Sequence, residues 1–217
     1  DGNEDSSPGG DYVKTFAVAT ASTPVLAIPD FARGPKQPIN LPAATLTAGL
    51  PITLTGASGL TSVSFTLNYD PTVLSVTEAT AGTALPSGWT LTRTLGSGQV
   101  TVTMSGTTPL TNAGTVTLAT LTASVPETAL YKTGKVLTFS NVSANSGAVQ
   151  LRSDSGVQVV AYLGDSSGDG RYNSLDASFI ARVGVGRDNG FNAYKMKDPT
   201  IIGDANADGS LGGIDAS

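Results

Sequence analysis

Apolar residues alternate with Ser and Thr through most of the chain, and this period of two excludes a largely helical fold. Val63, Phe65 and Leu67 alternate with hydroxyl and amide residues, and the stretch around Val102 repeats the pattern. A period of two puts one set of side chains on one face of a strand, which can then be buried. We therefore expect a mainly β protein, an antiparallel sandwich of residues 36–162 whose core includes Val63, Phe65, Leu67, Val102 and Leu121.

Turn-forming Gly, Pro and Asp separate the alternating stretches at the intervals of a sandwich. The expected strands cover residues 52–55, 63–69, 74–77, 89–95, 100–104, 115–125, 136–142 and 157–162. The apolar set shifts from Val116 and Leu118 to Leu121, which predicts a bulge near Ala119. Residues 1–35 are expected to be a linker, polar over residues 1–10, and an extended proline-rich segment.

Composition excludes several classes of function. The 217 residues carry a net charge of −5, with no basic run, so the chain lacks the footprint of a nucleic-acid-binding protein. His and Cys are both absent, which removes the Ser-His-Asp triad, the Cys nucleophile and the usual zinc sites. Glu residues are few and no carboxylate pair stands out, so we expect no enzyme. No apolar run reaches the roughly 20 residues that span a bilayer.

After Tyr162 the chain becomes acidic and Gly-rich and contains its first helical pattern. Leu175, Phe179, Ile180 and Val183 recur at helical spacing, with Ser174 as the expected N-cap, and so predict a helix. This segment also contains an internal repeat, because Gly-Asp followed later by Asp-Ala-Ser occurs twice with an offset of 39 residues. We expect a second domain at residues 163–217.

Each copy of the repeat contains a twelve-residue loop, DSSGDGRYNSLD and DANADGSLGGID. Calcium accepts six to eight oxygen ligands, and such loops supply them from positions 1, 3, 5, 7, 9 and 12, with Gly at position 6. The loops predict two calcium ions. The expected ligands are Asp165, Ser167, Asp169, the carbonyl of Arg171, Asn173 and Asp176 in the first loop, and Asp204, Asn206, Asp208, the carbonyl of Ser210, Gly212 with a water, and Asp215 in the second.

These paired loops, each leading into a helix, resemble the type I dockerin modules of bacterial cellulosomes and related surface proteins. Residues 59–71, 73–76 and 106–110 are similar to segments of cohesin, the nine-stranded jelly-roll partner of dockerin. The resemblance implies a jelly-roll β-sandwich at residues 36–162 and a small α-helical module with two EF-hand-type calcium loops at residues 163–217. Because the sequence ends at Ser217, we expect the helix after the second loop to be truncated.

The resemblance implies an extracellular, calcium-dependent assembly, adhesion or scaffolding protein, secreted or held at the cell surface. Its partners would be cohesin or dockerin modules. At loop positions 10 and 11, Ser174-Leu175 and Gly213-Ile214 replace the usual Ser-Thr recognition pair with a more apolar one. The short connection near Tyr162 leaves little slack for folding back, so copies of the chain are expected to associate head to tail into filaments.

Two alternatives stay open at this point. Each module serves a different partner, or the sandwich binds carbohydrate and the dockerin-like module anchors it. Sugar binding needs exposed aromatic side chains, and Trp89 is the single Trp, which we expect in a strand and in the core.

Overall fold

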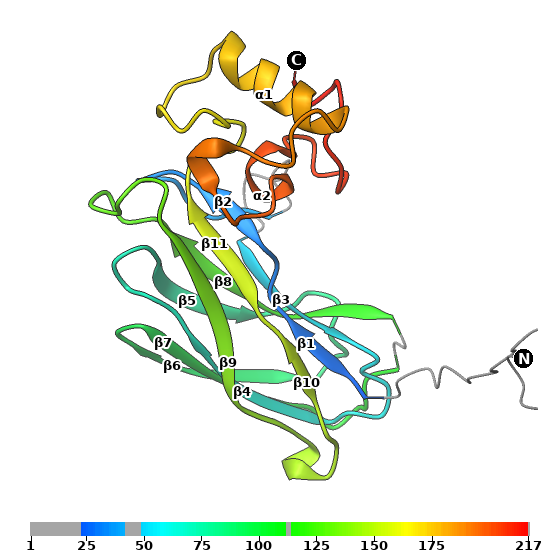
Figure 1. The fold of residues 1–217 in the computed structure, drawn as a ribbon. Helices are drawn as coiled ribbons and strands as arrows, with labels where there is room; N and C mark the ends of the chain where they lie inside the picture. Colours follow the sequence, from blue (N-terminus) through cyan, green and yellow to red (C-terminus); the bar gives the residue numbers. More distant parts are fainter. Residues whose placement is uncertain (1–22, 42–48, 112–113, 217) are drawn as a thin grey trace, which may run out of the picture.

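The alternating stretches form two β-sheets packed face to face, with a small helical module at one end (Figure 1). The computed structural model describes residues 23–41, 49–111 and 114–216. The predicted linker at residues 1–10 lies outside them. The expectation of a mainly β sandwich is confirmed.

Within the described residues, one sheet has five strands and the other six. The five-stranded sheet runs in the order β10 (Arg152–Asp154), β1 (Val25–Ala27), β3 (Leu50–Thr55), β8 (Thr115–Ser124) and β5 (Ser75–Ala81). The six-stranded sheet runs in the order β2 (Phe31–Arg33), β11 (Gly156–Val160), β9 (Gly134–Ala144), β4 (Ser62–Asn68), β7 (Gln99–Ser105) and β6 (Thr90–Gly96). A short 3-10 turn, η1 (Asn145–Gly147), follows β9.

Two features of these sheets correct the prediction. Strands β1 and β2 belong to the sandwich, so its expected start at residue 36 is too late. The sandwich is also not wholly antiparallel, because β1 pairs in parallel with β10 and β2 pairs in parallel with β11. At each end of the sandwich the chain crosses from the five-stranded to the six-stranded sheet, from β1 to β2 and from β10 to β11. The two crossing segments run side by side in the same direction.

The core lies between the sheets and confirms the predicted buried face. All five predicted core side chains are buried: Val63, Phe65, Leu67, Val102 and Leu121. Phe65 meets Phe139 of β9 edge to face, with ring centroids 5.5 Å apart. Alternation therefore identified which side of each strand faces inward.

The predicted bulge in β8 is present. Ile52 of β3 lies opposite Ala119, whereas Thr53 lies opposite Thr117, so Leu118 is the extra residue. Leu118 is nevertheless fully buried, because the extra residue brings the next apolar side chain back to the core face.

The first helix of the module is α1 (Ser174–Gly184), which is followed by the 3-10 turn η2 (Asn192–Tyr194) and the short helix α2 (Thr200–Gly203). The N-cap of α1 is Asn173, not the expected Ser174. The Asn173 side chain accepts a hydrogen bond from Leu175 N, and the Asp176 carboxylate accepts one from Asn173 N. This capping box holds the first turn.

The module packs against the end of its own sandwich. One apolar cluster joins sandwich and module side chains: Ala32, Val159, Ala161, Ile180, Phe191, Tyr194, Ile201 and Ile202. We expected the short connection near Tyr162 to prevent the module from folding back onto its own sandwich. This expectation is wrong, because the shared cluster shows that the module packs on the apolar end of the sheets. In the described part of the chain, no helix is long and apolar enough to cross a membrane.

Candidate functional site

The first twelve-residue loop is organised by the carboxylates at its two ends. Asp165 Oδ1 accepts a hydrogen bond from Gly168 N (2.8 Å), and Asp165 Oδ2 accepts one from Gly170 N (2.8 Å). Asp176 Oδ1 accepts from Ser167 N (2.8 Å), and the Ser167 hydroxyl donates to Asp165 Oδ1 (3.1 Å). The carboxylates at positions 1 and 12 therefore fix the backbone between them.

The second loop repeats this arrangement position by position. Asp204 Oδ2 accepts from Gly209 N (2.8 Å), which is again position 1 accepting from position 6. Asp215 Oδ1 accepts from Asn206 N (3.2 Å), which is position 12 accepting from position 3. Asp204 Oδ1 also accepts from Asp208 N (3.1 Å). The two loops thus share one hydrogen-bonded frame.

The backbone conformation repeats as well. Gly170 and Gly209, at position 6, have φ values of 79° and 85°, in the left-handed region that favours glycine. At position 4, Gly168 and Ala207 also have positive φ values, 72° and 61°. The repeated shape depends on the Gly that both loops have at position 6, and position 4 adopts a positive φ with either Gly or Ala.

The middle positions of the two loops pair in the same way. Asp169, at position 5, accepts from Arg171 N (2.8 Å), and Asp208 accepts from Ser210 N (2.9 Å). Asn206 Nδ2 donates to Asp208 Oδ2 (2.9 Å). These position 5 carboxylates are exposed at the loop surface.

Position 9 is where the loops differ. In both loops the backbone N–H at position 9 donates to the position 12 carboxylate, from Asn173 to Asp176 Oδ2 (2.9 Å) and from Gly212 to Asp215 Oδ2 (2.8 Å). The difference is the Asn173 side chain, which caps α1 and donates from Nδ2 to Asp169 Oδ2 (3.2 Å). The structure therefore places all twelve predicted ligand residues in two equivalent loops. In the chain that the structure describes, no three acidic, His or Cys side chains converge on one point, since the end carboxylates accept loop N–H groups.

Three loop carboxylates are buried, those of Asp165, Asp176 and Asp215. None of the four ion pairs among the described residues includes them. A buried carboxylate is costly unless hydrogen bonds and an opposite charge compensate it. Hydrogen bonds to these carboxylates are present, but no described ion pair neutralises their charge.

Tyr131, on the connection between β8 and β9, brings the sandwich into contact with the first loop. Its hydroxyl donates to Asp165 Oδ2 (2.5 Å) and accepts from Tyr162 N (2.9 Å). Burial raises the pKa of the Tyr131 phenol, and the bond to Asp165 raises it further. Burial opposes ionisation of Asp165, but hydrogen bonds from Tyr131, Gly170 and Gly168 outweigh it and lower the pKa of that carboxyl.

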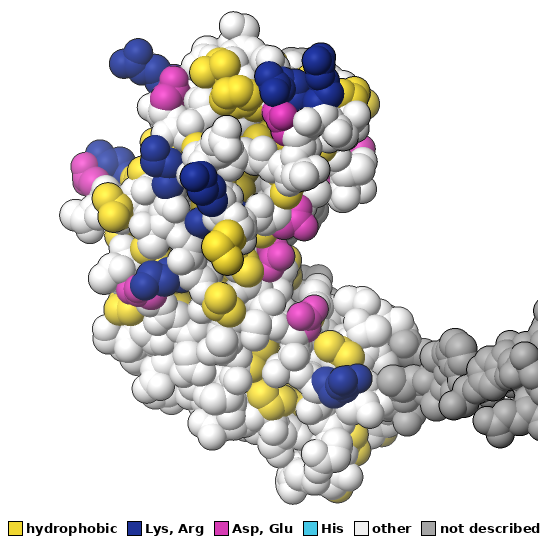
Figure 2. All heavy atoms as spheres, in the orientation of Figure 1, with side chains coloured by type: hydrophobic (Ala, Val, Ile, Leu, Met, Phe, Trp, Pro, Cys, Tyr) yellow, Lys and Arg dark blue, Asp and Glu magenta, His cyan; other side chains and the backbone are white. Residues whose placement is uncertain are grey.

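A second candidate surface is the outer face of β9, β4, β7 and β6. The strand registers place uncharged hydroxyl and amide side chains in rows across it: Ser64, Thr66, Asn68, Gln99, Thr101, Thr103, Thr138, Ser140 and Ser143. A shallow hollow of about 160 Å³ lies at one end of these rows, lined by residues that include Ser64, Thr103 and Ser143. Most charged side chains on the face in view in Figure 2 lie instead over the module and the adjoining sandwich end.

Trp89 is not in the core, contrary to our expectation. It precedes β6, is half buried, and its indole N–H donates to the carbonyl of Thr108 (2.8 Å). Its ring lies against Gly106, where a Cβ atom would overlap it. The ring therefore packs on the sandwich surface instead of standing out as a platform.

The residues at loop position 11 are exposed in both copies. Leu175 is 47% exposed and Ile214 is 71% exposed, and Tyr172, at position 8 of the first loop, is also exposed. On α1, Ile180 is buried and Phe179 packs against the shared cluster. The predicted apolar face of α1 is thus divided between the interior and the surface.

Comparison with known proteins gives the class of the sandwich. Residues 43–159 match the family model of the cohesin domain, and no curated protein matches the chain. Two sheets in this arrangement define a β-sandwich. Because the match covers more than half of the chain, the protein belongs to the cohesin family. The match ends before the module.

Solved structures agree on the fold. A non-cellulosomal cohesin from the archaeon Archaeoglobus fulgidus is 16% identical, with 63% of this chain and 89% of that chain covered, at a TM-score of 0.50. The sixth cohesin of scaffoldin B from Acetivibrio cellulolyticus is 17% identical, with 64% and 99% covered, at 0.52. The cohesin CaCohA2 from Clostridium acetobutylicum is 16% identical, with 64% and 90% covered, at 0.50. At these identities the likeness shows the fold alone.

Sequence analysis did not find Tyr131. Its neighbours, Leu130 and Lys132, form no motif, and Tyr131 is 34 residues from the carboxylate that it contacts. Only the folded chain brings the two together, so no local signal marks it.

Proposed function

We propose that this protein is a calcium-dependent assembly module whose cohesin sandwich binds dockerin-type partners outside the cell. Family membership supports a non-enzymatic role in protein assembly. Relatives of the same fold were solved with dockerins, including the Acetivibrio cellulolyticus cohesin with a Cel5 dockerin. Adhesion and scaffolding are the biological forms of such an interaction.

The observation that carries the calcium part is the repeated frame of the two loops. The candidate ligand atoms of each loop are all oxygens, at the spacing that calcium loops use. Together the loops bury three carboxylates that take part in none of the described ion pairs. When bound, calcium supplies the positive charge that these carboxylates lack. The ligands are those predicted from the sequence, from Asp165 to Asp176 and from Asp204 to Asp215. Millimolar extracellular calcium fits such sites, which agrees with a secreted or surface location.

Two exposed surfaces suit the assembly. The uncharged rows on β9, β4, β7 and β6 offer many hydroxyl groups and no charge that a partner must neutralise. At the opposite end, the module exposes Leu175 and Ile214, which suit an apolar contact. Because packing of the module on its own sandwich leaves both surfaces exposed, one copy can dock onto the next in a head-to-tail, heterologous contact that builds filaments.

Calcium titration by calorimetry tests the metal. We expect two ions per chain, and we expect Asp176→Ala and Asp215→Ala each to remove one. If the wild-type chain shows no heat of calcium binding, the calcium proposal is refuted.

Binding to immobilised dockerin modules, with and without chelator, tests the partner, and light scattering at several protein concentrations tests self-association. Thr103→Arg places a charge on the proposed face and should reduce binding at least tenfold. Thr80→Arg, on the exposed surface of β5 in the other sheet, is the matched control and should bind normally. If both variants bind equally well, the docking surface lies elsewhere. If the mass stays that of a monomer in calcium, self-association is refuted, and each of the two modules then serves a different partner.

A further inference from the structure

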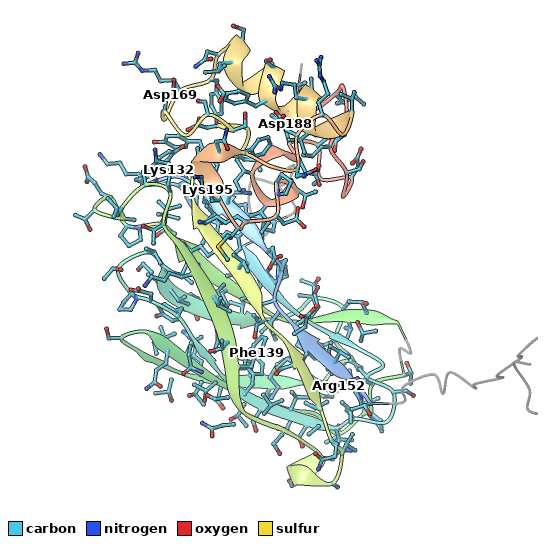
Figure 3. All side chains as sticks on the ribbon, in the orientation of Figure 1. Lys132, Phe139, Arg152, Asp169, Asp188 and Lys195 are labelled. Atoms are coloured by element: carbon cyan, nitrogen blue, oxygen red, sulfur yellow. The ribbon has the colours of Figure 1, made fainter. Side chains whose placement is uncertain are left out.

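Tyr131 occupies a position between the two parts of the chain. Its side chain packs against the apolar cluster shared by sandwich and module, and also against a second cluster within the sandwich end, which contains Val73 and Val125. The next residue, Lys132, lies beside Gly168, where a Cβ atom would come within 2.9 Å of its Cδ. Figure 3 shows Lys132 at this junction, below the loop that carries Asp169. The β8–β9 connection thus packs against one side of the first loop.

The Tyr131 hydroxyl uses both of its hydrogen-bonding roles at this junction. It donates to Asp165 Oδ2 and accepts from Tyr162 N, where the chain leaves the sandwich. Because Tyr162 is only three residues before Asp165, this one hydroxyl fixes both the exit from the sandwich and the first residue of the loop. The Asp165 carboxylate is fully buried and cannot easily rotate away.

Among the residues that the structure describes, the second loop has no equivalent. The described donors to Asp204 are Asp208 N and Gly209 N, and those to Asp215 are Ala205 N, Asn206 N and Gly212 N, all within the loop. The two loops share a hydrogen-bonded frame, but among the described residues only the first loop has a donor from the sandwich.

We propose that Tyr131 is a positioning residue for the first calcium loop, so that the sandwich completes one metal site while the module alone forms the other. This inference rests on the proposed calcium function. A hydrogen bond to Oδ2 orients the carboxylate, as partners of metal ligands commonly do. Removing such a partner lowers metal affinity about 10-fold to 100-fold.

The experiment isolates each site with a substitution at an exposed ligand. Asp208→Ala removes the second site and Asp169→Ala removes the first, and neither residue is buried. Tyr131→Phe is then added to each single-site chain, and calcium affinity is measured by calorimetry. We expect the dissociation constant to rise at least tenfold in the Asp208→Ala chain and to stay unchanged in the Asp169→Ala chain.

Tyr69→Phe is the control for loss of a hydroxyl, since Tyr69 donates to the carbonyl of Gly96, away from the loops. Circular dichroism verifies that each variant keeps its β-sheet signal. Equal weakening of both sites would make Tyr131 a general stabiliser of the module, and no weakening of either site would remove its role; both results overturn the inference while leaving the calcium proposal intact. A wild-type chain that binds no calcium overturns both.

Discussion

Phe65 is the most informative position at which to perturb the sandwich. Its side chain is fully buried on β4, faces the core between the sheets, and meets Phe139 edge to face. Phe65→Ala removes the whole ring from the centre of the packing. Neighbouring strands are held by main-chain pairing on both sides, so they cannot close the space.

The expected cost follows from burial and the aromatic pair. A buried Phe→Ala change lowers the free energy of unfolding by about 3–5 kcal/mol, through lost transfer free energy and the cavity left behind. The edge-to-face contact with Phe139 contributes about 0.5–1.5 kcal/mol of that cost. For a chain of this size, about 4 kcal/mol lowers the melting temperature by roughly 8–16 °C.

Urea unfolding followed by circular dichroism measures the change, with the slope expected to stay constant. Thr103→Ala, on the outer face of β7, is the matched control and should cost less than about 1 kcal/mol. If Phe65→Ala cost no more than this control, the inner and outer faces of β4 would be reversed and the reasoning from alternation would fail.

Three further outcomes are expected. Gly82→Ala should lower the free energy of unfolding by roughly 1–3 kcal/mol, because a Cβ atom would overlap the Thr117 carbonyl oxygen. Gly190→Ala is the control and should be near neutral, because its Cβ atom would meet nothing within 4 Å. The midpoints of urea unfolding compare the two variants. Hydrogen bonding to Lys135 lowers the pKa of Asp70, so the stabilisation is present above the unfolded-state pKa of about 3.9 and is lost as pH falls through the folded-state value. Urea midpoints should therefore fall more for the wild type than for Asp70→Asn between about pH 6 and about pH 2, and equal falls would contradict this. Finally, calcium at about 1 mM should stabilise the module by about 4 kcal/mol per site if the dissociation constant is about 1 μM, which melting curves with and without chelator measure.

The strands that were missed show where alternation stops being informative. β1 and β2 have three residues each, which is too few to display a period, and both lie in a proline-rich segment. Their parallel pairing with β10 and β11 depends on partners more than 120 residues away. The N-cap of α1 was misplaced by one residue because Asn173 and Ser174 can both cap a helix, and the hydrogen bond from Asn173 N to Asp176 selects the former.

The sequence by itself determined the buried face of the sandwich and the shape of both loops. The reason is that strand alternation and the hydrogen bonds within each loop depend on residues close together in the chain, such as Asp165 and Asp176. The tertiary structure alone decided that the module packs on its own sandwich and that Tyr131 contacts Asp165. Those contacts join residues that are far apart in the chain. They come together only when the apolar ends of the sandwich and the module are buried against each other, and no local sequence pattern contains that information.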